Sequence, residues 1–567
     1  MVGREACLVQ VATSVAAMLE WYDFSIFGFM ATEVGLNFFD AGDGDALIKT
    51  LGLFGGAFIA RPIGGVLFGH LGDMGCGGRE EPLIRRRLRA LEGSLLLMAV
   101  PAVAIAVLPN RSAIGMAAPV AMLLVRLMQG LSVGGQLVGA LLSAAEEAPT
   151  GRELGVVAYV MAACNSGTLL GATVSFACHA AFSDEELVEW AWRVPFAIGA
   201  LLSLAAFGMV RAVRPFAARR EEHDAARAQP GDVHIELPST STCTDSTSPA
   251  HQPTNLPGEP AVSERDAAGG EAPRPPAQAS PLRSVLASGT GRRKLFGCVC
   301  AWGVHTSTFY TTVLFMPLFE VTFLFERHEG ASAAAFALSA VSQLLACILV
   351  PLVGRYADFA IRPVLEKARA ASPDAAASTS LLSPPCHQQM GLSADTQEKL
   401  RVGVWAPPPT CLLQHWLGVR TRAAAVSLAI ASPLALLIAQ YGALPGNPPV
   451  VAWAWTIAAV ALLLIHLVII DALVGAWILS IFAPEVRFSA VALAVNVGTM
   501  LFAAPAPAIE LALARESPQM RWSAGLFVSA AAVCAVVGTR IAEDPRDDRR
   551  RLAEPQSISS SARGVQL

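Results

Sequence analysis

The chain has 567 residues, of which 54% are hydrophobic and only 15% are charged, and its mean hydropathy is +0.50. A water-soluble domain carries about 25% charged residues, so this composition excludes an ordinary soluble fold and predicts a protein with much of its surface in lipid. The formal net charge of -4 excludes the strongly basic surface that nucleic-acid-binding proteins use.

The first apolar run begins at Leu8 and is interrupted by Glu20 and Asp23. A cleavable signal peptide has an uninterrupted apolar core, so we interpret this run as a permanent first helix. A membrane-spanning helix needs about 20 mostly apolar residues, and this criterion predicts twelve spans in an all-α membrane protein. The expected spans are 8–36, 50–71, 91–108, 114–143, 154–180, 192–212, 295–324, 332–356, 421–440, 450–482, 488–514 and 522–541.

A long polar segment divides these spans into two groups of six. The segment at 213–293 is rich in Pro, Ser, Thr and charge without an apolar period, which is typical of a disordered linker. A second polar insertion covers 359–420, within which 412–417 is compatible with a short interfacial helix. The expected units are an N-terminal six-helix bundle (1–212), a C-terminal six-helix bundle (294–541) and a tail (542–567).

Basic side chains gather in alternate loops. They follow the second and eighth spans, flank the central linker and occur in the tail, whereas the intervening loops are acidic or neutral. Cytoplasmic loops carry the excess of Lys and Arg, so we expect both termini and the linker on the cytoplasmic side, with the plasma membrane as the default location.

Short motifs recur in the two halves. Gly69-x-x-x-Asp73 follows the second span, and Gly354-x-x-x-Asp358 follows the eighth. An Ala-Pro-x-x-Arg motif likewise ends in Arg152 after the fourth span and in Arg487 after the tenth. Repeated halves of this kind are a transporter architecture, with the substrate bound between them near the middle of the membrane.

Ionisable residues inside spans are candidates for function, because a charge in the bilayer is costly. Glu20 and Asp23 are three residues apart and lie about 60° apart around a helix axis. Two close carboxylates repel when both are ionised, so one of them tends to hold a proton, as a coupling group must. The alternatives are that both line a watery vestibule or that they pair with arginine.

Arg61 and Arg126 are the cationic candidates. Helical spacing allows Arg126, Gln129 and Gln136 to form one polar stripe, and an arginine fork suits a substrate carboxylate. The alternative is a structural ion pair between Arg126 and Glu20 or Asp23, while Arg61 lies nearer a loop that it would hold.

In the second half, polar residues within apolar runs are fewer: His305, Tyr310, Gln343, His466 and Asp471. Tyr310 is a candidate to hydrogen-bond a substrate. A buried histidine more often bonds to a neighbouring helix than relays protons, and His466 and Asp471, five residues apart, need not face each other.

Four stretches of the first half resemble a known family. They are Glu20-Trp21-Tyr22-Asp23-Phe24, then Arg61-Pro62-Ile63-Gly64-Gly65 with Gly69-His70-Leu71-Gly72-Asp73, then Arg126 to Gly135, and Trp192-Arg193-Val194-Pro195-Phe196. They are similar to motifs of the major facilitator superfamily, and within it of the metabolite:proton symporter group, which includes proline/betaine, α-ketoglutarate, citrate and shikimate carriers.

The resemblance implies a major facilitator fold of two six-helix bundles, and a monomer in the lipid bilayer that carries a small organic acid or zwitterion with a proton by alternating access. It implies no enzyme activity, cofactor or metal. An uncoupled facilitator, an exporter and a non-transporting sensor or scaffold are the alternatives. The implied substrate-binding or proton-coupling residues are Glu20, Tyr22, Asp23, Arg61, Arg126, Gln129, Gln136 and Tyr310. The implied cytoplasmic gate residues are Gly69, Asp73, Glu146, Arg152, Gly354, Asp358 and Arg362.

The chain departs from the family pattern in three places. The basic partner that normally follows Asp73 directly is displaced to Arg79, Gln136 replaces the group's glutamate, and Ser480 stands near the place of an acidic residue. A nucleotide-binding loop, a metal-ligand spacing among the eleven cysteines and a nucleophile with an orienting base are all absent from the sequence.

Overall fold

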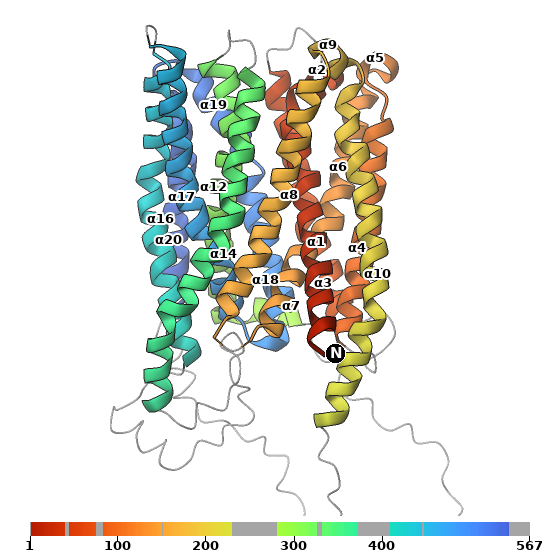
Figure 1. Cartoon of the computed structure of the whole chain (residues 1–567), viewed down its shortest axis with the longest axis vertical. Helices are drawn as coiled ribbons and strands as arrows, with labels where there is room; N and C mark the ends of the chain where they lie inside the picture. The colour runs from red at the N-terminus through yellow and green to blue at the C-terminus, as the bar shows by residue number, and fades with distance from the viewer. Residues whose placement is uncertain are drawn as a thin grey trace, which may run out of the picture.

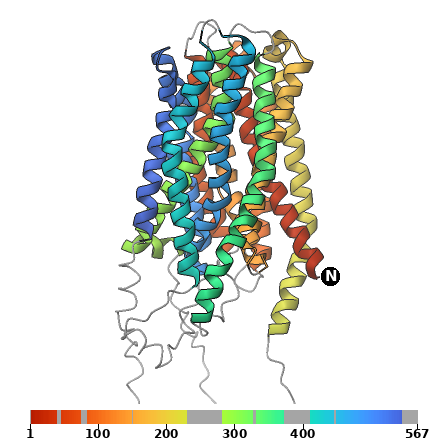
Figure 2. The same ribbon diagram turned by 60° about the vertical axis from the view of Figure 1, so that its left-hand side comes forward.

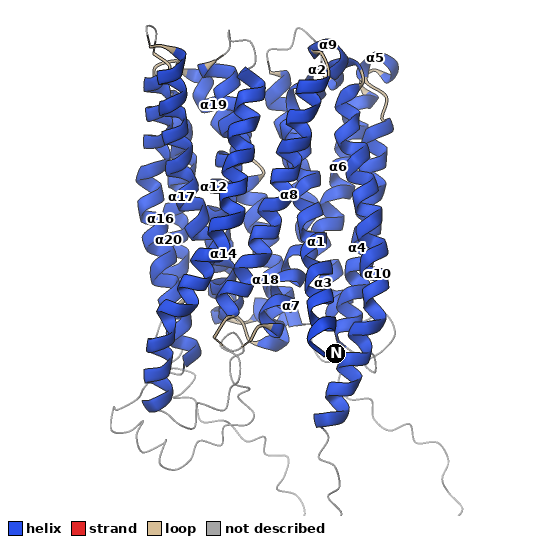
Figure 3. Ribbon diagram, in the orientation of Figure 1, coloured by secondary structure: helices blue, strands red, loops and turns tan. Residues whose placement is uncertain are grey.

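The computed structural model describes residues 2–39, 45–74, 83–149, 151–228, 281–325, 331–371, 409–444 and 447–543. Within these ranges the chain is helical and contains no strand (Figure 3). Two sets of long, roughly parallel helices stand side by side, the first half at the right of Figure 1 and the second at the left, and a turned view shows the same bundle (Figure 2). The lower face is defined here as the end of the bundle where α1 begins.

The first half contains six spans, some of them broken into two helices. Its long helices are α1 (Val2–Phe29) with α2 (Ala31–Phe38), α3 (Ala46–Met74), α4 (Leu83–Val107), α6 (Ala117–Val133) with α7 (Gln136–Glu147), α8 (Glu153–Ala181) and α10 (Val194–Ala228). Short helices α5 (Arg111–Ile114) and α9 (Asp184–Glu189) and a 3-10 turn (Ala191–Arg193) cap the upper face.

The second half repeats this plan with π-helical breaks. Its first span joins α12 (Gly289–Tyr310), a π-helical segment (Thr311–Phe315), α13 (Met316–Phe319) and a second π-helical segment (Glu320–Leu324), after the short α11 (Pro281–Ala287). The others are α14 (Ala331–Ala371), α16 (Pro409–Gly442), α17 (Pro449–Ile481), α18 (Pro484–Gly498) joined by a π-helical segment (Thr499–Ala503) to α19 (Ala506–Glu516), and α20 (Gly525–Ala542) after a 3-10 turn (Arg521–Ala524).

The expected twelve spans are present. Eleven of the described helices are long and apolar enough to cross a membrane by length and composition alone. The twelfth is α1, which carries Glu20 and Asp23 and runs through the bundle beside the others. The chain is therefore a multi-pass membrane protein.

The polar segments are shorter than the sequence predicts. Helix α10 continues to Ala228 and α11 begins at Pro281, so both ends of the expected linker at 213–293 are helical. The insertion expected at 359–420 is helical up to Ala371 and again from Pro409. The prediction of a short interfacial helix at 412–417 is wrong, because these residues belong to the continuous helix α16. The remainder of both segments lies outside the described residues.

Glycines allow the helices of the first half to approach closely. A Cβ added at Gly167 of α8 would lie 1.9 Å from the carbonyl oxygen of Met18 on α1, and one at Gly130 of α6 would lie 1.6 Å from that of Ala57 on α3. Small residues at such contacts let backbones meet, which is how helices associate in a membrane without a hydrophobic driving force. The position of α1, and of its two carboxylates, depends on Gly167.

We expect Gly167→Val to destabilise the protein, because its side chain would meet the backbone of α1. Overpacking of this kind costs about 1–3 kcal/mol or more. The matched control is Gly208→Val on α10, where an added Cβ would meet nothing within 4 Å. The thermal unfolding midpoint of the purified full chain should fall for Gly167→Val alone; equal midpoints for the two variants would contradict the close contact of α1 with α8.

Candidate functional site

The two carboxylates of α1 contact polar side chains of other helices: one contacts an arginine, and the other contacts a glutamine that is bonded to an arginine. Glu20 Oε1 lies 3.5 Å from Nη2 of Arg61 on α3, and the two side chains are 1% and 4% exposed. Asp23 Oδ2 accepts a hydrogen bond from the amide of Gln129, whose own oxygen accepts one from Arg126. Both contacts are buried. Of the alternatives for the two carboxylates, pairing with arginine is the one observed for Glu20, whose partner is Arg61. Asp23 is linked to Arg126 indirectly, through Gln129.

Aromatic rings cover both guanidinium groups. The Arg126 guanidinium carbon lies 3.8 Å from the ring centre of Phe27, and that of Arg61 lies 4.1 Å from the ring centre of Phe24. A cation over an aromatic face is stabilised most when it is shielded from water. All four aromatic and cationic groups come from α1, α3 and α6, so these three helices hold the charges together.

Several polar atoms of this cluster have no hydrogen-bond partner among the described residues. They include Nε and Nη2 of Arg126, Nε of Arg61, Oε2 of Glu20 and the phenol oxygen of Tyr310. A buried polar atom left without a partner costs about 1–3 kcal/mol, and more when it is charged. The site therefore has donors and one acceptor ready for a polar ligand or for water.

A small cavity of about 10 Å³, room for about one water molecule, lies between the two halves beside Glu20 and Arg61. Its lining comes from both halves: Glu20, Trp21, Arg61, Val133, Gly134, Leu137, Val138, Trp302, Val495, Asn496 and Thr499. Across it, the amide of Asn496 on α18 donates to the carbonyl oxygen of Gly134 at the break between α6 and α7, at 2.5 Å. The Glu20–Arg61 pair thus faces the interface along which the halves would separate.

Tyr310 reaches this region from the second half. The centre of its ring lies 5.5 Å from the ring centre of Phe54 and 5.6 Å from that of Phe58, both on α3. It lies 6.2 Å from the ring centre of Trp21 on α1. Tyr310 therefore packs against α1 and α3, the helices that carry Glu20 and Arg61, while its expected hydrogen bond to a substrate stays a prediction.

Two expected site residues point elsewhere. The Tyr22 hydroxyl donates to the carbonyl oxygen of Pro195, in the first turn of α10, at 2.8 Å. The Gln136 amide donates to Ser94 of α4 at 2.9 Å. The polar stripe expected from Arg126 through Gln129 to Gln136 is therefore wrong at its last member, because α6 ends at Val133 and α7 begins a new helix at Gln136.

Sequence reasoning missed two buried carboxylates of the second half. Glu320 and Glu510 are 1% and 0% exposed, and Glu510 accepts a hydrogen bond of 2.5 Å from Thr311. Each lies inside an expected span, so the rule that singled out Glu20 would have found them. His305 and Asp471, which are far apart in the sequence, also meet, with Nε2 and Oδ1 3.1 Å apart.

Asp358 joins the two halves at the lower face. Its carboxylate oxygens accept hydrogen bonds from the backbone N–H groups of Leu154, at 3.0 Å, and Gly155, at 2.8 Å. These N–H groups belong to the first turn of α8, where a helix has no internal acceptors and carries partial positive charge. Gly354 allows the approach, because a Cβ there would lie 2.4 Å from that of Ala158.

The other expected gate residues occupy varied places. Gly69 of α3 faces the ring of Phe488 on α18, and a Cβ added at Gly69 would lie 3.4 Å from that ring. Asp73 lies in the last turn of α3, but its side chain is outside the described part of the structure. Glu146, Arg152 and Arg362 are exposed.

Pairing of Glu20 with Arg61 predicts strong coupling between them. Arg61→Gln should lower the free energy of unfolding by about 3–5 kcal/mol, because it leaves a buried carboxylate uncompensated, and Glu20→Gln should recover part of that loss. The control cycle uses Glu92 and Arg214, a pair at 2.7 Å with Arg214 30% exposed, for which coupling of about 1 kcal/mol or less is expected. Additive losses in the Glu20–Arg61 cycle would contradict the pairing.

Removal of the Asp358 carboxylate should expose the start of α8. In Asp358→Ala, the amides of Leu154 and Gly155 lose a charged acceptor worth about 1.5–3 kcal/mol, so their hydrogen exchange should accelerate about tenfold or more. Glu366→Ala, which removes an exposed carboxylate about two turns away on the same helix, is the control. Unchanged exchange at both amides in Asp358→Ala would show that the carboxylate does not hold the two halves together.

Comparison with known proteins gives consistent results. A putative proline/betaine transporter of Staphylococcus haemolyticus is 34% identical over 217 residues, covering 36% of this chain and 42% of that protein. The alpha-ketoglutarate permease of Escherichia coli strain K12 is 34% identical over 202 residues, covering 35% and 44%. The matches thus span less than half the length of these curated relatives.

Solved structures match over nearly the whole chain. The proton:xylose symporter XylE superposes with a TM-score of 0.55 at 13% identity, covering 95% of each chain, which shows a common fold. The family model of the Major Facilitator Superfamily matches residues 10–366, more than half of the 567 residues. With twelve spans in two halves and a polar cluster between them, the chain belongs to the Major Facilitator Superfamily.

Proposed function

We propose that this protein is a secondary active transporter that carries a small organic acid or zwitterion together with a proton. The observation that carries the proposal is the set of buried polar atoms without hydrogen-bond partners among the described residues, on Glu20, Arg61, Arg126 and Tyr310. Glu20 and Arg61 of this set line a small cavity between the halves. The names of the relatives, for proline/betaine and alpha-ketoglutarate, support these substrate classes.

Arg126 is suited to the acidic group of such a substrate. Its Nε and Nη2 lie on one edge of the guanidinium group and have no partner among the described residues, while Nη1 bonds to Gln129. Two adjacent N–H donors match the two oxygens of a carboxylate. The Tyr310 hydroxyl from the opposite half supplies a further hydrogen bond, so that the substrate would draw the two halves together.

Glu20 and Asp23 are suited to carry the proton. Both are buried among apolar helices, where Glu20 contacts Arg61 of α3 and Asp23 accepts a hydrogen bond from Gln129 of α6. Protonation of either carboxylate therefore weakens the contact that it makes with that helix. When a substrate carboxylate takes Arg126, the chain from Arg126 through Gln129 to Asp23 loses positive charge, and a proton on Asp23 compensates for it. Binding of the anion and of the proton thereby favour each other.

Contacts at both ends of the interface support an occluded state in this cycle. Asp358 closes the lower face, and a Cβ at Gly28 of α1 would lie 2.2 Å from the side chain of Leu314, which marks close packing nearer the upper face. The basic loops favour the lower face as the cytoplasmic side, and we propose a monomer in the plasma membrane with cytoplasmic termini. In alternating access, the Asp358 contact must break whenever the cavity opens to the lower face.

Uptake by proteoliposomes tests this function. Labelled proline, glycine betaine and α-ketoglutarate are offered with and without an inward proton gradient, and the wild type should accumulate at least one of them only with the gradient. Glu20→Gln and Asp23→Asn should lower that accumulation by about tenfold, equivalent to about 1.4 kcal/mol of lost coupling. Glu92→Gln, which removes a carboxylate paired with Arg214 and not among the cavity-lining residues, is the matched control.

The outcomes separate the alternatives. Equal uptake with and without the gradient would make the protein an uncoupled facilitator, and outward movement alone would make it an exporter. Full gradient-driven accumulation in both carboxylate variants would overturn the coupling role. Failure of all three probes to move would overturn transport of these substrate classes and leave a sensor or scaffold.

A further inference from the structure

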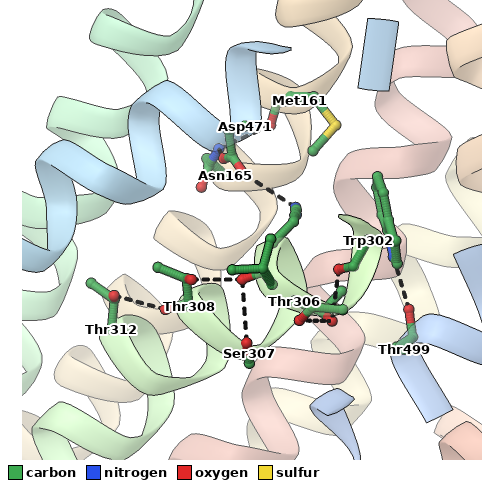
Figure 4. A network of polar contacts seen from close by, with 12 residues as sticks. Met161, Asn165, Trp302, Thr306, Ser307, Thr308, Thr312, Asp471 and Thr499 are labelled. Atoms are coloured by element: carbon green, nitrogen blue, oxygen red, sulfur yellow. Dashed lines mark hydrogen bonds and ion pairs between the residues drawn. The ribbon is translucent and has the colours of Figure 1, made fainter. Parts of the chain in front are cut away.

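A second buried acid–base pair lies in the second half. His305 of α12 and Asp471 of α17 are each 1% exposed, and Nε2 lies 3.1 Å from Oδ1. The other carboxylate oxygen, Oδ2, accepts a hydrogen bond of 2.9 Å from the amide of Asn165, which belongs to α8 of the first half (Figure 4). The charge of Asp471 is therefore shared between a titratable partner in its own half and a neutral donor across the interface.

An aromatic ring covers one face of His305. Its ring stacks on that of Trp302, with centres 4.4 Å apart and planes inclined by 14°, and an aromatic face stabilises an imidazolium ion. Neither ring nitrogen of His305 has a hydrogen-bond partner among the described residues, and neither has Oδ1 of Asp471, although Nε2 and Oδ1 lie 3.1 Å apart. A proton can therefore be added to the pair without breaking a hydrogen bond. Trp302 also lines the central cavity, which places the imidazole one ring away from it.

The other titratable groups near the pair are few. Cys164 of α8 and Cys347 of α14 lie within electrostatic range of Asp471, and Cys164 is also in range of Glu20 on α1. On α12 itself, Cys300 is in range of Cys534 from α20. The side chain that reaches Trp302 from the segment after α18 is the neutral Thr499.

His466, the other buried histidine of the second half, lies on α17 and is bonded elsewhere. Its Nε2 lies 2.9 Å from the hydroxyl of Ser427 on α16, and its Nδ1 lies 2.8 Å from the carbonyl oxygen of Leu462 in its own helix. Both of its ring nitrogens therefore have partners within the second half and away from Asp471. His466 is a matched control for His305.

We propose that His305 and Asp471 together bind one proton, and that this proton controls the contact between α17 and α8 through Asn165. The inference rests on the proposed transport function, to which it adds a second protonation site in the other half. The proton enters from water on one side, forms an N–H bond on the imidazole, and returns to water on the other side. No other bond is made or broken.

Charge balance explains the control. Without the proton, the pair carries a net negative charge, and the amide of Asn165 is the donor that compensates Asp471 from the first half. Separation of α8 from α17 would then leave a buried anion with one donor fewer. With the proton, imidazolium and carboxylate neutralise each other, so the bond to Asn165 is no longer needed and the halves are released.

Reactivity of Cys164 reports this separation without any substrate. Cys164 precedes Asn165 on α8 and is 2% exposed, and glutathione added to the same sample serves as a water-exposed reference thiol. The full chain in lipid nanodiscs is treated with N-ethylmaleimide at pH values from about 5 to about 8, and modification of each cysteine is quantified by mass spectrometry. Binding of one proton changes the ratio of Cys164 to glutathione reactivity by up to about tenfold per pH unit.

The variants should shift the profile in opposite directions. In the wild type and in His466→Gln, the ratio should rise as the pH falls. Asp471→Asn removes the charge and should keep the ratio high at every pH, while His305→Gln removes the proton acceptor and should keep it low. Glu20→Gln is measured in the same way, so that a pH response arising from the carboxylates of α1 can be distinguished from that of His305 and Asp471.

Specific results would overturn the proposal. They are a wild-type ratio that does not change with pH, a wild-type profile retained in both Asp471→Asn and His305→Gln, and loss of the profile in His466→Gln. The cysteine assay needs no solute, so its result does not depend on the uptake experiment. Failure of the three uptake probes would contradict the transport function, whereas the Cys164 profile decides the role of His305 and Asp471.

Discussion

The arrangement of the first half depends on the pairing of buried charge. Glu20 and Asp23 lie within a membrane-spanning helix, where an unpaired carboxylate would be costly. Arg61 on α3 and the Arg126–Gln129 pair on α6 compensate them, and this fixes the rotation of α1 against two neighbours. Gly167 then lets α8 pack on another side of α1. Charge pairing and close packing thus select the same position for this helix.

Both halves use the same physical devices at the interface between them. Carboxylates or amides of one half accept from, or donate to, the other half: Asp358 at the start of α8, Asn165 to Asp471, and Asn496 to the backbone of Gly134. Each bond is polar and lies among apolar helices, so its strength depends on local charge. Where the acceptor is a carboxylate, as in Asp358 and Asp471, we propose that a change in its charge weakens the bond and favours separation of the halves.

The sequence predicts the helices well because apolar length alone defines a membrane span. It also identifies Glu20, Asp23, Arg61 and Arg126, because ionisable residues inside spans are rare. It does not identify their partners, since contacts between helices depend on rotation and on breaks such as the one between α6 and α7. For that reason helical spacing groups Gln136 with Arg126, although the Gln136 amide bonds to Ser94.

Long-range pairs are harder to predict. His305 and Asp471 are both visible in the sequence as polar residues within apolar runs, yet only the packing of α12 against α17 brings them together. The helical extensions to Ala371 and Ala228 escape the sequence criteria because their polar composition resembles that of a linker. The repeated motif does identify Gly354 and Asp358, which meet the start of α8, whereas the side chain of the equivalent Asp73 lies outside the described residues.

The central claim is that buried carboxylates between the halves couple a solute to a proton. The most direct measurement is the pH of a weakly buffered suspension of proteoliposomes, without an imposed gradient, when glycine betaine, proline or α-ketoglutarate is added outside. We predict a rise in external pH with the transported solute, and no rise with Glu20→Gln or Asp23→Asn. Uptake of labelled solute by wild-type vesicles without any change in pH would contradict the claim.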